Sequence, residues 1–159
     1  MNRPHILPFR LLLCLWLLCF ALPSAAQRGL HVEPLFGSSY GKRKDATEVM
    51  LKGSSLKPYK LTLFRSLSFV PSAVEAKTVE QKVIADAKGA VDKETVNRKG
   101  RLYYGFYQLK PASGQRRYLI YRNNALSASP TADSPGLLLI YLEGTATPQE
   151  LQSFFKKKP

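Results

Sequence analysis

The residue types that most often carry catalysis are scarce in this chain. Its 159 residues include two histidines, and His31 is the one that follows Ala26. A general base or a Ser-His-Asp triad in that part of the chain would have to use His31. This histidine lies in a stretch without a clear structural pattern, so we favour a surface position or a place on an edge strand over a catalytic role.

The remaining groups do not form a known catalytic pattern either. Both cysteines, Cys14 and Cys19, precede Ala26, so the chain from Gln27 onward has no thiol nucleophile, and with one histidine it lacks the usual set of zinc ligands. The 11 acidic residues are scattered and form no carboxylate pair of the kind that glycosidases use. There is no glycine-rich phosphate loop. The sequence therefore predicts a protein without enzymatic activity, metal site or cofactor.

The N-terminal segment up to Ala26 has the order of a secretory signal peptide. Arg3 and Arg10 are followed by an apolar run from Leu11 to Leu22, and small residues lead to Ala26. We expect cleavage between Ala26 and Gln27, and hence no transmembrane span in the mature chain. A retained membrane anchor is the alternative, although a spanning helix needs about 20 apolar residues. A lipoprotein signal is a third reading.

Export without disulfides is more typical of bacterial envelope proteins than of small secreted animal domains. We therefore expect an exported protein, periplasmic or extracellular, in a Gram-negative bacterium. The formal net charge of +13 favours contact with anionic surfaces such as lipid headgroups, acidic glycans, nucleic acid or acidic proteins. A basic surface that serves solubility alone would have the same composition.

Five segments have the composition or alternation of β-strands, and two have the pattern of helices. The predicted strands are residues 46–51, 59–69, 101–110, 116–123 and 136–144. Ser72 with Glu75, and Thr147 with Glu150, form capping boxes at the two helix starts. Residues 92–100 are polar and are expected to close the first helix. A short edge strand could lie at residues 31–36.

These elements predict an α+β fold in the order β-β-α-β-β-β-α. We expect a mostly antiparallel sheet of about five strands with two helices on one face. The predicted domains are a signal peptide at residues 1–26, a loosely structured N-terminal segment at 27–45, and a single α+β domain at 46–159. Residues 127–135 are expected to form a flexible loop.

If both helices cover one face, the other face would expose aromatic and basic side chains. Tyrosine and arginine are enriched at protein interfaces, and an arginine can lie over an aromatic ring. The predicted binding residues, on the strands at residues 101–110 and 116–123, are Arg101, Tyr103, Tyr107, Arg117, Tyr121 and Arg122. The basic and aromatic run from Lys99 to Phe106 is reminiscent of RNA-binding sheets, but its spacing does not match their motif.

Several blocks together resemble a family that has no assigned function. These blocks are EVMLKG (48–53), YKLTLFRSL (59–67), GRLYYGFYQL (100–109), RYLIYRNN (117–124) and LLIYLEGTATPQEL (138–151). The family is a domain of unknown function from secreted proteins of Bacteroidetes-type bacteria. The resemblance spans roughly residues 30–156 and implies an envelope location, but it supplies no functional residues.

Together these features predict a non-enzymatic secreted or periplasmic module that binds a protein or an anionic partner. The main alternative is a polyanion or nucleic-acid binder that acts through charge alone, and the third is a hydrolase whose site the sequence does not reveal. The sequence indicates neither the partner nor the oligomeric state.

Overall fold

The computed structural model describes residues 29–37, 40, 42–127 and 136–156. The predicted signal peptide, its cleavage position at Ala26 and Gln27, and most of the predicted loop at 127–135 lie outside the described residues. Within those residues, no helix is long and apolar enough to cross a membrane.

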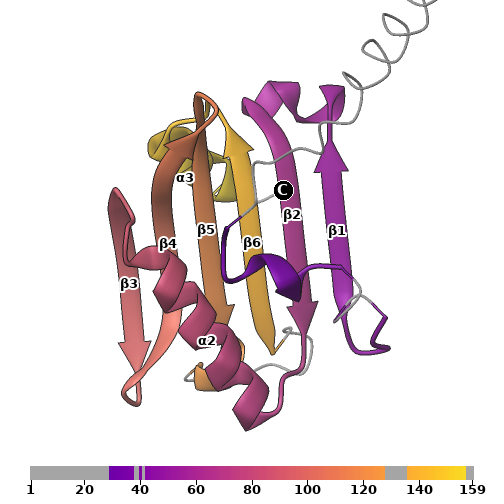
Figure 1. Cartoon of the computed structure of the whole chain (residues 1–159), viewed down its shortest axis with the longest axis vertical. Coiled ribbons are helices and arrows are strands. Elements are labelled where there is room, and N and C mark those ends of the chain that lie inside the picture. Colours follow the sequence, from indigo (N-terminus) through magenta and orange to yellow (C-terminus); the bar gives the residue numbers. More distant parts are fainter. Residues whose placement is uncertain (1–28, 38–39, 41, 128–135, 157–159) are drawn as a thin grey trace, which may run out of the picture.

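A six-stranded sheet in which every neighbouring pair is antiparallel forms the centre of the fold (Figure 1). Strands β3 to β6 form a meander that brings β6 beside β2, so the order across the sheet is β1-β2-β6-β5-β4-β3. The prediction of a mostly antiparallel α+β fold is confirmed. The strands are β1 (Thr47–Lys52), β2 (Leu61–Phe69), β3 (Asp92–Arg98), β4 (Arg101–Ala112), β5 (Gln115–Asn123) and β6 (Leu137–Gly144).

The predicted number of about five strands is wrong, because the polar residues expected to close the first helix form strand β3 instead. Strand β3 lies at the edge of the sheet and pairs with β4 alone. Six of its seven residues are exposed. An edge strand of this kind needs no apolar alternation, so hydrophobic periodicity gives no signal for it. The element order is therefore β-β-α-β-β-β-β-α.

Two α-helices begin at the predicted capping residues. Helix α2 (Ala73–Ala87) follows Ser72, whose side chain accepts a hydrogen bond from the Glu75 N–H. Helix α3 (Pro148–Lys156) follows Thr147, whose hydroxyl accepts a hydrogen bond from the Glu150 N–H. The described residues also include the short 3-10 helices η3 (Glu33–Leu35), η4 (Ser54–Tyr59) and η5 (Asn124–Leu126).

The two α-helices lie on opposite faces of the sheet, which corrects the prediction that both cover one face (Figure 1). Along β5, Leu119 and Tyr121 are buried on the first face, while Tyr118 and Ile120 are buried on the second. A central strand that is apolar on both sides needs cover on both sides. We call the side that carries α2 the first face and the side that carries α3 the second face.

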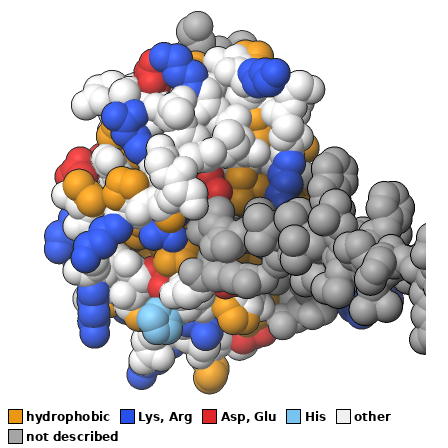
Figure 2. All heavy atoms as spheres, turned by 45° about the horizontal axis from the view of Figure 1, so that its top comes forward, with side chains coloured by type: hydrophobic (Ala, Val, Ile, Leu, Met, Phe, Trp, Pro, Cys, Tyr) orange, Lys and Arg blue, Asp and Glu red, His pale blue; other side chains and the backbone are white. Residues whose placement is uncertain are grey.

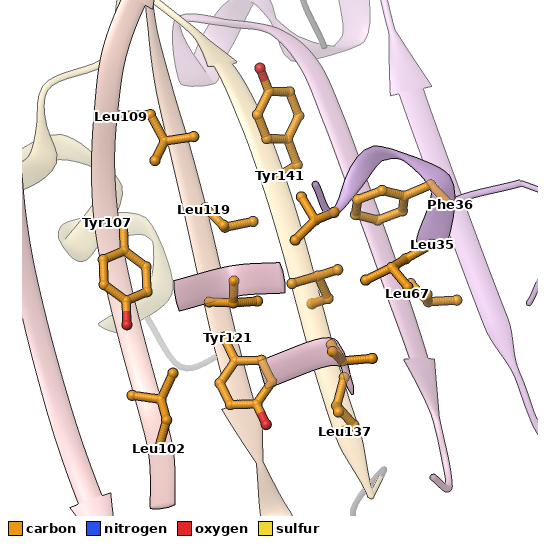
Figure 3. Packing of buried hydrophobic residues seen from close by; sticks show 14 of the residues in the cluster. Leu35, Phe36, Leu67, Leu102, Tyr107, Leu109, Leu119, Tyr121, Leu137 and Tyr141 are labelled. Carbon is orange, nitrogen blue, oxygen red and sulfur yellow. The ribbon is translucent and has the colours of Figure 1, made fainter. Parts of the chain in front are cut away.

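The first face holds the larger core. Val79 and Val83 of α2 are fully buried against apolar side chains of β2, β4, β5 and β6. Figure 3 shows Tyr107, Tyr121 and Tyr141 among these side chains, so they belong to the core. Gly105 leaves room for the Tyr107 ring, because a Cβ there would lie 2.5 Å from Cε2 of that ring.

The N-terminal segment at residues 31–37 completes this core instead of forming the predicted edge strand. It includes η3, and Val32, Leu35 and Phe36 are buried on the first face (Figure 3). The core therefore begins before residue 46. Pro34 lies within η3, where its missing N–H costs no ladder bond.

Two carboxylates fix this N-terminal segment in place. The Asp86 side chain of α2 is 2% exposed and accepts hydrogen bonds from the backbone N–H groups of His31, at 2.7 Å, and Val32, at 3.0 Å. Glu48 of β1 accepts from the Gly37 N–H at 2.8 Å. Arg65 of β2 binds Glu48 and places its guanidinium 4.8 Å from the centre of the Phe36 ring.

Candidate functional site

The second face has an open groove that α3 leaves uncovered. Helix α3 has nine residues and packs Leu151 on one end of this face, against a cluster that includes Tyr118 and Leu142. Beside the helix lies a groove of about 410 Å³ whose residues come from β3, β4, β5, β6 and α3. Its lining consists of Glu94, Tyr104, Phe106, Ile120, Arg122, Leu138, Ile140 and Gln152.

The strand alternation explains why the floor of the groove is apolar. Phe106, Ile120 and Ile140 are opposite one another on neighbouring strands, in the registers Phe106–Ile120 and Ile120–Ile140. In that order, the three residues are 5%, 8% and 9% exposed. Because residues paired in register share a face, these strands line up a row of apolar side chains across the sheet.

A β-bulge determines which β4 side chains reach the groove. Asn97 is opposite Leu102 and Val96 is opposite Tyr104, so Tyr103 is the extra residue between them. Such an insertion reverses the alternation, because side chains otherwise point to opposite faces in turn. Leu102 is therefore buried on the first face, while Tyr104 lies on the second.

Charged groups of both signs lie at the rim of the groove. Arg122 donates from Nη2 to the Tyr103 hydroxyl at 3.1 Å, and the Arg98 guanidinium lies 3.8 Å from the centre of the same ring. Burial acts to raise the pKa of Tyr103, but the hydrogen bond and charge of Arg122, with the charge of Arg98, lower it overall. Glu94, also in the lining, brings a negative charge near Tyr104.

A second hollow on the same face is almost wholly apolar. Its volume is about 270 Å³, and it lies between β1, β2, η4, β6 and α3. The Tyr59 and Phe154 rings meet edge to face there, with their centres 5.3 Å apart. We call it the apolar hollow; it is lined by Leu51, Leu56, Tyr59, Leu61, Phe64, Leu142, Leu151 and Phe154.

The predicted site residues do not form one surface. Tyr107 and Tyr121 are 3% and 0% exposed in the first-face core and cannot contact a partner in this structure. Burial raises the pKa of Tyr121 to about 12, and the nearby Glu80 charge adds to this effect. The Tyr121 hydroxyl has no hydrogen-bond partner among the described residues. The Asn123 side chain lies close enough to act on the hydroxyl and lower its pKa, but no hydrogen bond of ordinary geometry joins the two groups.

The predicted arginines have separate environments. Arg101 binds the buried carboxylate of Glu80 at 2.6 Å, and Glu80 also accepts from the Leu102 N–H. Arg117 donates from Nε to the Lys110 carbonyl at 2.8 Å. Only Arg122 of the six predicted residues lines the groove, with Tyr103 bonded to it.

Sequence reasoning missed most of the groove lining. The alternation of β5 and β6 could have identified Ile120, Leu138 and Ile140 as members of one face. In β4 the bulge at Tyr103 changes the alternation, so the sequence assigns Tyr103 and Tyr107 to a common face. The contribution of Gln152 depends on where α3 packs, which no local pattern reveals.

His31 forms the one His-Asp pair that the described residues contain. Its Nδ1 lies 2.8 Å from Asp86 Oδ1, and its side chain is 62% exposed. No hydroxyl or thiol of a described residue hydrogen-bonds to its ring. Asp86 instead holds the backbone of the N-terminal segment. Within the described part of the chain, no three residues among His, Cys, Asp and Glu are grouped so that they could bind a metal ion.

Comparison with known proteins gives a family but no activity. No curated protein and no solved structure matches the chain significantly. A model of a family of unknown function (DUF6108) matches residues 19–155, which includes every strand and nearly all of α3. The chain therefore belongs to this family of unknown function.

Proposed function

We infer that this protein is a non-enzymatic binding module and that the groove on the second face is its binding site. The proposed partner is a protein segment that inserts apolar side chains over Phe106, Ile120 and Ile140 and places an acidic group near Arg122. The observation that carries this proposal is an apolar floor in a groove of about 410 Å³ with charged groups at its rim. Small numbers of oriented polar groups around an apolar surface are typical of binding sites.

The mixed charge at the rim favours a protein segment over a simple polyanion. Arg122 attracts an anion, whereas Glu94, which lines the same groove, repels one. A protein segment can satisfy both, because it can present acidic and basic side chains on either side of its apolar residues. This arrangement supports specificity through the positions of charges more than through net charge.

The charge-driven alternative rests on the formal net charge of +13. Figure 2 shows Lys and Arg side chains spread over the surface in view, with acidic and hydrophobic side chains between them. Several arginines are paired, including Arg43 with Asp45 and Glu75. Dispersed and partly neutralised charge supports solubility and steering more than a dedicated polyanion site.

The location and the absence of enzymatic activity belong to the same proposal. We propose export to the periplasm or the exterior of a Gram-negative cell, supported by the order of Arg3, Arg10 and the apolar run to Leu22. Mass spectrometry of the secreted protein should then find an N-terminus at Gln27. A mature protein that retains residues 11–22 would contradict export by cleavage.

The binding site can be tested by photo-crosslinking in the native cell. Gln152 lines the groove and is exposed, so a photoreactive residue at this position should capture the partner. Gln81 is an exposed glutamine on α2 and provides the matched control on the first face. We expect a discrete adduct at position 152 and none at 81. Equal adducts at both positions, or an adduct at 81 alone, would place the partner elsewhere.

Salt dependence then separates the shaped groove from charge alone. A polyanion binder with several phosphate contacts loses about a thousandfold or more in affinity between 50 and 200 mM salt. Binding in an apolar groove with one contributing arginine should lose about tenfold or less. A steep loss for the captured partner would favour the charge-driven alternative.

A further inference from the structure

The two edges of the sheet differ in their protection against pairing with another strand. Strand β3, at one edge, has four charged side chains among seven residues: Asp92, Lys93, Glu94 and Arg98. Strand β1, at the other edge, exposes three apolar side chains in a row: Val49, Met50 and Leu51 are 38%, 54% and 45% exposed. Edge strands that are not meant to pair usually have charges or proline, and the centre of β1 has neither.

The sequence of β1 is complementary to itself in the antiparallel direction. Glu48 and Lys52 flank the three apolar residues symmetrically about Met50. When two such strands pair antiparallel with Met50 opposite Met50, Glu48 of each copy is opposite Lys52 of the other. Val49 of each copy is then opposite Leu51. Opposite charges and apolar pairs in direct register stabilise a ladder.

In this register, residues that lie opposite each other in the two copies are on the same face of the sheet. Glu48, Met50 and Lys52 are paired with Leu67, Arg65 and Leu63 of β2, so they lie on the first face. Val49 and Leu51 lie on the second face, and Leu51 lines the apolar hollow. A two-fold axis perpendicular to the sheet at Met50 keeps the first faces of both copies on one side. Val49 of the second copy would then extend the wall of the hollow beside Leu51.

Shifted registers are less complementary. Because side chains alternate between the faces, only shifts by two residues keep the faces matched. A centre at Val49 places Glu48 opposite Met50, and a centre at Leu51 places Lys52 opposite Met50. The Glu48 side chain is 16% exposed, and its carboxylate is held on the first face by Arg65 and the Gly37 N–H. Lys52 of the second copy would therefore approach an ion pair that already exists, and the apolar residues at the centre of β1 supply most of the complementarity.

We propose that the protein forms a symmetric dimer in which β1 of one copy pairs antiparallel with β1 of a second copy, centred on Met50. The dimer continues the sheet across both copies and leaves the groove on the second face of each copy open. This proposal is independent of the proposed function, because Gln152 and Arg122 line the groove on the other side of α3 from the apolar hollow.

The mass of the purified protein in solution tests the dimer. Sedimentation over about a hundredfold range of concentration should show a dimer that dissociates on dilution. Met50→Arg places two guanidinium groups opposite each other on the axis and should give a monomer at every concentration. Val96→Arg introduces the same charge on β3 and should leave the dimer intact. It is a matched control because Val96 is 42% exposed and Met50 is 54% exposed. Circular dichroism confirms that both variants fold.

Disulfide trapping tests the register in a chain with Cys14 and Cys19 replaced by serine. Met50→Cys places the two new thiols opposite each other, so oxidation should give a covalent dimer. Thr47→Cys is the control on the same exposed strand, because its copies lie at opposite ends of the paired segment and should not cross-link. A monomeric wild type, a dimeric Met50→Arg variant, or stronger cross-linking at 47 than at 50 would each overturn the proposal.

Discussion

Replacing Tyr121 with phenylalanine should stabilise the protein, whereas the same change at Tyr141 should destabilise it. Both side chains are fully buried on the first face. The Tyr121 hydroxyl has no hydrogen-bond partner among the described residues. The Tyr141 hydroxyl donates to the buried carboxylate of Glu143 at 2.6 Å. Both substitutions remove a buried hydroxyl oxygen, but only the Tyr141 hydroxyl makes a hydrogen bond.

The expected free energies follow from the cost of an unmet polar group. A buried hydroxyl without a partner costs about 1–3 kcal/mol, so Tyr121→Phe should raise the free energy of unfolding by about 1 kcal/mol after the small void is counted. A hydrogen bond to a charged group contributes about 1.5–3 kcal/mol, and Tyr141→Phe should lower the free energy of unfolding by that amount. The two variants should therefore differ by about 3 kcal/mol.

Urea unfolding monitored by circular dichroism measures both free energies. If the dependence of the free energy of unfolding on urea concentration is unchanged, the variants expose the same surface area on unfolding. Tyr118→Phe is the control, because the Tyr118 hydroxyl donates to the neutral carbonyl of Ala146 at 2.6 Å. It should cost about 1 kcal/mol. If Tyr121→Phe destabilises as much as Tyr141→Phe, then the Tyr121 hydroxyl has a partner and our account of this core is wrong.

Three further predictions concern pH and packing. Burial raises the pKa of Tyr121 from 10 to about 12, so the folded state resists ionisation of this hydroxyl. The free energy of unfolding should not depend on this group below pH 10 and should fall as the pH approaches 12, and tyrosinate absorbance follows the ionisation. Lys60 and the Thr147 N–H lower the pKa of Glu150 from 4.5 to about 2. The stability that the ionised Glu150 contributes should therefore be intact above pH 4.5 and be lost as the pH falls towards 2. A Glu150→Gln variant should lack this loss of stability in acid when melting temperature is measured against pH. Val83→Asp buries a charge at a fully buried position and should unfold the domain, while Val91→Asp at a 62% exposed position should change the free energy of unfolding by less than about 0.5 kcal/mol. Equal effects in denaturant titrations would contradict the packing of α2.

The elements that sequence reasoning identified are those whose signals are local. The capping boxes at Ser72 and Thr147 depend on residues three apart, and both helices begin there. The alternation of β2 and the apolar character of β4, β5 and β6 likewise identify strands without knowledge of their neighbours. The antiparallel arrangement follows because short connections join strands that are adjacent in the chain.

The features that the sequence could not reveal depend on contacts between distant segments. Strand β3 is stabilised by pairing with β4, and its exposed polar residues have no pattern of their own. The N-terminal segment adopts its place because Asp86 and Glu48, far apart in sequence, accept its N–H groups. The bulge at Tyr103 turns Leu102 to the first face, away from Tyr104, and no residue type in the sequence indicates it.

The groove as binding site is tested most directly by two charge reversals, compared for their effect on binding to the partner captured through position 152. Arg122→Glu changes the groove, and Lys77→Glu makes the same change in net charge at an exposed position on α2. We expect Arg122→Glu to raise the dissociation constant by about tenfold or more, while Lys77→Glu changes it by less than about twofold. An equal loss of affinity in both variants would contradict a binding site in the groove and support attraction by net charge.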